Sequence, residues 1–257
     1  MSKSPAISDQ HIITVLGAYA GMVDRVLRNP GRWLGTDEHP PPCAPFPARA
    51  LDALRDRALG DKTPASPTWG EEPVQRRVDW WVTRIGVSAG LAAAAPRFFG
   101  ALANRVPLQA ALGAAAAGLA VCAAAREHGA TAPEEWIPIL GRVLFDRELH
   151  AGPDDIPDTE ASEQQLEGDT AGSDGGSDGS GGVTDGARRA AGTVWHLARG
   201  LTGLDELLGH RPRGGRLVRL VAQVPVVGVA SGWLDERGGI KKAAREASHL
   251  VQQPSPA

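Results

Sequence analysis

Residues 106–125 of this 257-residue chain read V-P-L-Q-A-A-L-G-A-A-A-A-G-L-A-V-C-A-A-A. The only strongly polar side chain of this stretch is Gln109, and half of its residues are alanines, which have the highest helix propensity. A helix that is apolar on all sides is buried either in protein or in lipid. The stretch therefore predicts a central helix with other helices packed around it.

A second apolar stretch, residues 85–95, precedes the first, and Pro96 and Arg97 separate the two. We expect an Ala-rich hairpin over residues 85–125. The first arm is shorter than the roughly 20 residues that a membrane-spanning helix needs. Alanine and glycine also contribute little to the insertion of the second arm. The pattern favours a buried or re-entrant hairpin over two full spans, although small residues such as Gly113 and Gly118 also occur where helices pair in lipid.

The composition favours an all-α fold without bound metal. Apolar residues make up 42% of the chain and aromatic residues only 5%, so the core is expected to consist mainly of Ala, Val and Leu. Cys43 and Cys122 form no C-x-x-C pair, and the seven histidines lack the spacing of metal ligands. No nucleic-acid-binding motif occurs. We expect no metal, no cofactor and no nucleic-acid partner.

Charge divides the chain into three parts. Residues 1–150 carry 16 Lys+Arg and 15 Asp+Glu, residues 151–186 carry none and 10, and residues 187–257 carry 11 and 5. Few apolar residues and a high net charge are typical of disordered segments. The sequence therefore predicts a helical body over 1–150 and a disordered acidic linker, rich in Gly and Ser, over 151–186. A basic helical segment over 187–257 is expected to pack back on the body.

Start and stop signals place the remaining helices. Ser8 or Asp9 can cap a helix that runs to Asn29 and is stopped by Pro30. Further helices are expected over residues 48–59, from Pro73 onward, after a T-x-x-E capping box at Thr131 and Glu134, over 194–208, and from Gly239 towards the C-terminal end.

Two basic surfaces are candidate contact sites. Trp80 falls outside the apolar face of its helix, where an indole is unusual unless something covers it. Tryptophan and arginine suit contacts with proteins and with lipid headgroups. A basic amphipathic helix near the C-terminal end could lie on an anionic membrane, and an ordinary solvated helix face would show the same pattern. The candidate contact residues are Arg76, Arg77, Trp80, Trp81 and Arg84 in the first surface and Lys241, Lys242 and Arg245 in the second.

The sequence offers no constellation of catalytic residues. The glycines of residues 172–186 follow no predicted strand and precede no G-K-[ST], so they do not form a phosphate loop. Glu134 and Glu135 are two acids in a first helical turn, where the helix dipole favours them. Cys122 is expected to be a buried thiol with a raised pKa and therefore a poor nucleophile.

Two blocks of the sequence resemble the EcsC family of bacterial proteins. The first block is R-x-G-x-x-A-G-L-A-A-A-A-P in residues 84–96 together with residues 106–122. The second is V-P-V-V-G-V-A-S-G-W-L in residues 224–234, followed by I-K-K-A-A-R-E-A. Together they cover less than half of the chain. The resemblance implies an all-helical, membrane-associated protein with no catalytic residues to assign.

We therefore expect a non-enzymatic cytoplasmic protein, peripheral to or re-entrant in the membrane. Its partner would be an anionic membrane surface or a membrane protein. The alternatives are a soluble helical adaptor without lipid contact and an enzyme with an unrecognised site.

Overall fold

A computed structural model describes residues 7–34, 62–94, 107–157, 185–201, 204 and 228–252. Helices are the only regular elements in these ranges, which confirms the all-α fold. In chain order the elements are α1 (Asp9–Arg28), α2 (Pro30–Leu34), the 3₁₀ turn η1 (Trp69–Glu71), α4 (Val74–Ala94), α5 (Pro107–Glu127), α6 (Pro133–Phe145), the 3₁₀ turn η4 (Pro153–Asp155), α8 (Asp185–Gly200) and α11 (Gly228–Gln252).

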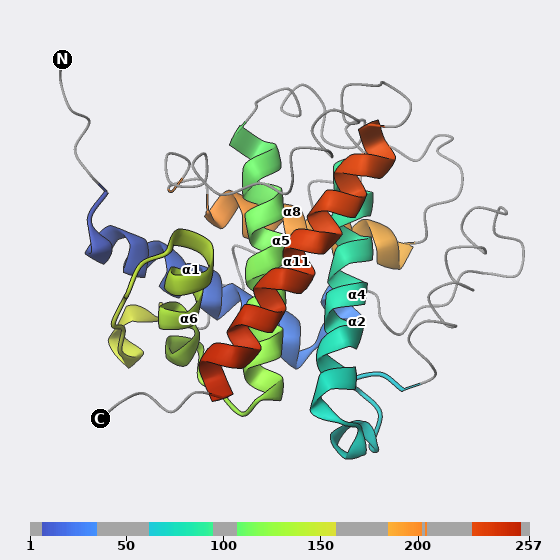
Figure 1. The fold of residues 1–257 in the computed structure, drawn as a ribbon, viewed down its shortest axis with the longest axis horizontal. Coiled ribbons are helices and arrows are strands. Elements are labelled where there is room, and N and C mark those ends of the chain that lie inside the picture. Colours follow the sequence, from blue (N-terminus) through green and yellow to red (C-terminus); the bar gives the residue numbers. More distant parts are fainter. Residues whose placement is uncertain are drawn as a thin grey trace, which may run out of the picture.

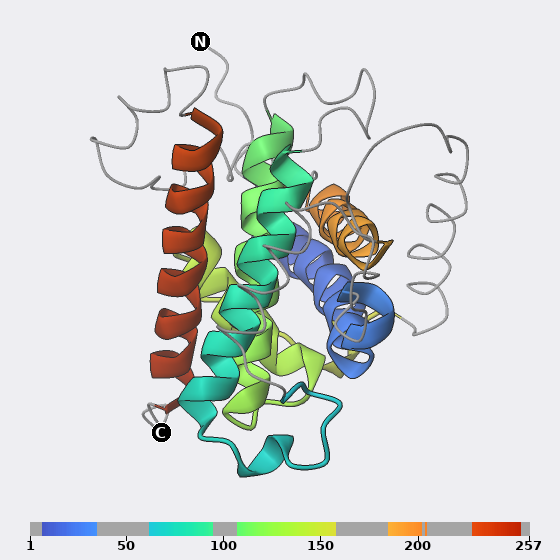
Figure 2. The same ribbon diagram turned by 90° about the vertical axis from the view of Figure 1, so that its right-hand side faces the viewer.

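The central element is α5, which contacts α1, α4, α6, α8 and α11. Figure 1 shows α4 and α11 running alongside α5. In Figure 2 α11 lies on one side of α4 and α5, and α1 and α8 lie on the other. From Ala111 to Ala125 every residue of α5 is buried except the half-buried Leu112. The apolar helix predicted from residues 106–125 is thus enclosed by other helices of the same chain.

The two arms of the predicted hairpin correspond to the end of α4 and to α5. These helices pack against each other, while residues 95–106 between them lie outside the described ranges. Within the part of the chain that the structure describes, we find no helix with the combination of length and hydropathy that crossing a bilayer requires.

A tyrosine and a glycine determine how closely α1 approaches α5. Tyr19 is fully buried and donates a hydrogen bond of 2.6 Å from its Oη to the carbonyl oxygen of Ala115. A Cβ atom added to Gly118 would lie 2.7 Å from that Oη, closer than real side chains come. Gly118 is therefore needed at this position because only glycine leaves room for the tyrosine ring.

Side chains of α4 and α8 satisfy the free carbonyl groups at the end of α2. A helix leaves its last carbonyl oxygens without partners in the helix. Arg84 of α4 donates to the carbonyl oxygen of Leu34 at 3.1 Å. Thr193 of α8 donates its hydroxyl to the carbonyl oxygen of Trp33 at 2.8 Å. These contacts join three helices and explain why Arg84 and Thr193 are buried.

The predicted helix boundaries agree best with the structure at α1. The hydroxyl of Ser8 accepts a hydrogen bond from the backbone N–H of His11, as predicted for the cap, and α1 ends at Arg28. The helix expected over 194–208 begins earlier, at Asp185, and α8 ends at Gly200. The last helix begins at Gly228 rather than Gly239. The helix expected over residues 48–59 lies outside the described residues.

The capping box predicted before α6 is wrong by one residue. The helix begins at Pro133, and its cap position is Ala132 rather than Thr131. The side chain of Glu135, not that of Glu134, accepts from the backbone N–H of Ala132 at 3.0 Å. The reason is that proline is favoured at the first helical position, where its missing N–H costs no hydrogen bond.

Part of the predicted linker is folded. Residues 151–157 contain η4, which packs on α1, and Ile156 is half-buried against the core. A Cβ atom on Gly17 would lie 2.0 Å from the carbonyl oxygen of Asp155, so the two backbones are in direct contact. The prediction of a linker is therefore wrong for residues 151–157, because Ile156 supplies an apolar anchor. It is also wrong for Asp185 and Gly186, which begin α8. The other residues of the predicted linker, 158–184, lie outside the described ranges.

Asp146 ends α6 in the left-handed conformation, with φ 53°. The backbone N–H of Asp146 donates to the carbonyl oxygen of Arg142 at 3.2 Å, as in the αL type of helix C-cap. Glycine adopts this conformation without a steric cost. We expect Asp146→Gly to raise the free energy of unfolding by about 0.5–1 kcal/mol in urea denaturation. Asp146→Ala should lower it, and equal stability of the two variants would contradict this explanation.

Candidate functional site

The first predicted contact surface is mostly buried. Trp80, Trp81 and Arg84 are 5%, 3% and 8% exposed, and Arg77 is half-buried. Only Arg76 is exposed among the five residues predicted there. These side chains therefore do not form one outer surface in the described structure.

A third tryptophan, Trp69, packs over Trp80 and explains its burial. Trp69 of η1 contacts Trp80 edge-to-face with ring centroids 5.5 Å apart. Trp80 contacts Trp81 in the same manner at 5.0 Å. Such pairs contribute about 0.5–1.5 kcal/mol beyond the burial of apolar area. The turn before α4 thus folds over the indole, and a partner is not needed to explain it.

Glu127, the last residue of α5, contacts this tryptophan cluster and was not predicted as a site residue. Its Oε1 accepts from the indole nitrogens of Trp69 at 3.1 Å and Trp81 at 2.8 Å. Its Oε2 pairs with Arg77 at 2.7 Å, and the carboxylate side chain is only 8% exposed. A carboxylate in the last turn of a helix opposes the helix dipole. That unfavourable position is the one sequence signal that could have indicated compensating donors.

His128 follows Glu127 and joins the ends of α5 and α11. Burial and the positive charge of Arg77 lower the pKa of His128, and the negative charge of Glu127 opposes this effect. Its Nδ1 lies 3.4 Å from the side-chain nitrogen of Gln252, the last residue of α11. The arrangement favours a neutral ring that links two helix ends.

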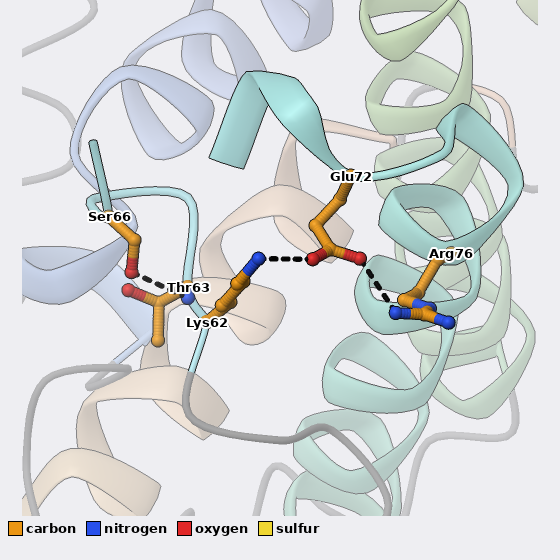
Figure 3. Close-up of polar contacts among 5 residues, drawn as sticks. All are labelled: Lys62, Thr63, Ser66, Glu72 and Arg76. Atoms are coloured by element: carbon orange, nitrogen blue, oxygen red, sulfur yellow. Dashed lines mark hydrogen bonds and ion pairs between the residues drawn. The ribbon is translucent and has the colours of Figure 1, made fainter. Parts of the chain in front are cut away.

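Glu72 links the two ends of the segment that leads into α4 (Figure 3). Its carboxylate accepts from Lys62 on one side and from Arg76, at 2.9 Å, on the other. The hydrogen bond from Lys62, followed by that from Arg76, lowers the pKa of Glu72. Arg76 is thus exposed but engaged in an ion pair, and its role in the structure is to hold this segment.

The second predicted surface is exposed. Within the described end of α11, Ile240, Ala243, Ala244 and Ala247 are buried, as the periodicity predicted. The opposite face carries the exposed side chains of Lys241, Lys242, Arg245, Glu246 and His249, which we call the α11 outer face. At about 100° per residue the three cations span about 100° of the helix surface, and Glu246 lies about 40° beyond that sector. The α11 outer face is the remaining candidate contact site.

The described residues offer little catalytic chemistry. Cys122 is fully buried, and burial raises the pKa of its thiol well above its usual value, so the nucleophilic thiolate is disfavoured. No group of metal-ligating side chains is found in the described ranges. The carboxylate of Glu127 is fully engaged by its three donors in holding η1 and α4 to α5.

Comparison with known proteins identifies no relative of this chain. No protein-family model matches the chain, and neither a curated protein nor a solved structure matches it.

Proposed function

We propose that the protein is a non-enzymatic, EcsC-like helical protein that associates peripherally with the cytoplasmic face of a membrane through the α11 outer face. The observation that carries this proposal is that basic and apolar residues lie on opposite faces of α11. Lys241, Lys242 and Arg245 are exposed together, while the alanine-rich side of the helix packs on the bundle. Basic residues close to an anionic leaflet each contribute about 1 kcal/mol of attraction.

The α11 outer face supports electrostatic binding rather than insertion. Between residues 239 and 252 no exposed side chain is apolar. An interfacial helix that enters the headgroup region presents Trp, Phe or Leu on its membrane face. Binding of this protein should therefore depend strongly on salt, because mobile ions screen exposed charges beyond about 10 Å at 0.1 M.

The same chemistry suits an acidic surface on a soluble protein. The absence of exposed apolar residues between 239 and 252 supports this second function, a soluble adaptor. Binding to vesicles distinguishes the membrane function from the adaptor function.

The proposal is tested with vesicles of phosphatidylcholine, with and without phosphatidylserine, at low and high salt. We expect the wild-type chain to sediment with the anionic vesicles at low salt only. The triple variant Lys241→Gln, Lys242→Gln, Arg245→Gln should lose roughly 30- to 150-fold in affinity, since three cations at about 1 kcal/mol each are removed near one acid. Glu246→Gln should bind more tightly than the wild type.

A matched control removes the same charge from three separate helices. Arg28, Arg76 and Arg142 are 66%, 74% and 47% exposed, and each takes part in an ion pair. After their replacement by glutamine, Asp24 keeps Arg126 and Glu72 keeps Lys62 as partners. This control should bind vesicles nearly as well as the wild type. Equal losses in both triple variants would show that net charge, not the α11 outer face, governs binding, and absence of wild-type binding would favour the adaptor.

A further inference from the structure

His128 connects the end of α5 to the end of α11. It follows the last residue of α5, and its backbone N–H donates to the carbonyl oxygens of Ala124 and Ala125 at 3.1 Å. Its half-buried ring meets the end of α11, where Nδ1 lies 3.4 Å from the side-chain nitrogen of Gln252. That nitrogen is an amide donor, so Nδ1 accepts from it only while this ring nitrogen carries no proton. The contact between the two helix ends therefore depends on the protonation state of His128.

The surroundings of the ring do not favour a second proton. Among the described residues, the charged groups that act on the ring are Arg77 of α4, which repels a protonated ring, and Glu127 of α5, which attracts it, while α11 presents the uncharged amide of Gln252. Both oxygens of Glu127 are already occupied, Oε2 by Arg77 and Oε1 by two indole nitrogens. The Nε2 atom of His128 is buried and meets no hydrogen-bond acceptor in the described ranges. A protonated ring would therefore be a second cation beside Arg77, and Glu127 would compensate its charge only in part.

We propose that His128 is a pH-sensitive link, in which the neutral ring holds the last turn of α11 and the protonated ring turns out to solvent and releases that turn. The other side chains before Gln252 hold the turn weakly, since Leu250 and Val251 are only half-buried. Burial and the charge of Arg77 lower the pKa of His128 in the closed link, whereas a ring in solvent has the ordinary pKa of a histidine. Release should therefore begin as the pH falls below the ordinary value and reach its full extent below the lowered one. This link does not rest on the proposed membrane function.

Hydrogen exchange of the full-length protein tests the link. Protection of the backbone N–H groups of residues 249–252, which end α11, should fall several-fold between about pH 8 and about pH 5 after correction for the intrinsic exchange rate. The N–H groups of the buried Ala243 and Ala244 should keep their protection. In His128→Gln, whose side chain is uncharged at every pH, the protection of residues 249–252 should not depend on pH. His249→Gln is the matched control, because it removes another histidine from the same turn and should retain the pH dependence.

A measurement on the wild type does not depend on the folding of the His128 variant, which circular dichroism checks. The imidazole resonances of His128 should shift over the same pH range in which residues 249–252 lose protection. Equal protection at both pH values in the wild type, or a pH dependence that persists in a folded His128→Gln variant, would overturn the inference. Higher protection in acid would overturn it as well, since it would show that the amide of Gln252 turns its oxygen towards a protonated ring.

Discussion

Replacing Glu127 by leucine is expected to lower the free energy of unfolding by about 3–5 kcal/mol, as measured by urea denaturation. The change leaves the guanidinium of Arg77 and the indole N–H groups of Trp69 and Trp81 without their acceptor. Removing one partner of a buried ion pair typically costs about 3–5 kcal/mol, because the other charge stays buried. The relief of an unfavourable dipole interaction, about 0.3–1 kcal/mol, reduces this loss only slightly.

Two controls test the explanation of the Glu127 effect. In a variant that already carries Arg77→Met, the same Glu127→Leu change should cost less, and the difference measures the coupling of the pair. Glu148 is 80% exposed and pairs with Arg142, so Glu148→Leu should change stability by no more than about 0.5 kcal/mol. A loss below about 1 kcal/mol for Glu127→Leu would show that water reaches the three donors.

Substituting alanine for Gly118 is expected to destabilise the protein by about 1–3 kcal/mol, although alanine is the better helix former. The added methyl group would meet the Oη of Tyr19 at 2.7 Å and two ring carbons at 3.0 Å. The ring is fully buried, so it can move only by disturbing the α1–α5 contact and its hydrogen bond to Ala115. Thermal denaturation followed by circular dichroism measures the effect.

Gly192 provides the matched control for Gly118. It lies inside α8, and a Cβ atom there would meet nothing within 4 Å. Gly192→Ala should therefore raise stability by up to about 1 kcal/mol through helix propensity alone. The Tyr19→Phe background removes the nearest clashing atom, so Gly118→Ala should cost less in it than in the wild type. A stabilised Gly118→Ala variant would contradict the close packing of α1 on α5.

Part of the tryptophan cluster could be predicted from the amino-acid sequence. The periodicity of α4 correctly marked Trp80 as an indole outside the apolar face that requires cover. Helical periodicity identifies faces but not the residues opposite them. The cover comes from Trp69 in η1, where a single turn carries no periodic signal. A surface patch was therefore the natural prediction from one helix alone, and the actual partner lies in the same chain.

The orientation of the basic helix was predicted correctly, whereas the start of the linker was not. The faces of α11 followed from spacing, because a long helix with alanines on one side and lysines on the other has one favourable orientation on a core. The predicted linker wrongly includes residues 151–157, because Ile156 stands alone between acids and prolines and gives no periodic signal. Its burial depends on the surface that α1 presents through Gly17, which no local pattern reveals.

The helical class, the central position of residues 106–125 and the outward direction of Lys241, Lys242 and Arg245 could be predicted from the amino-acid sequence. These features depend on composition and helical periodicity, which are local properties of the chain. The contacts of Glu127 with Trp69, Trp81 and Arg77 could not be predicted in this way. Such contacts join segments about 50 residues apart, and their geometry exists only once α4 and α5 have packed.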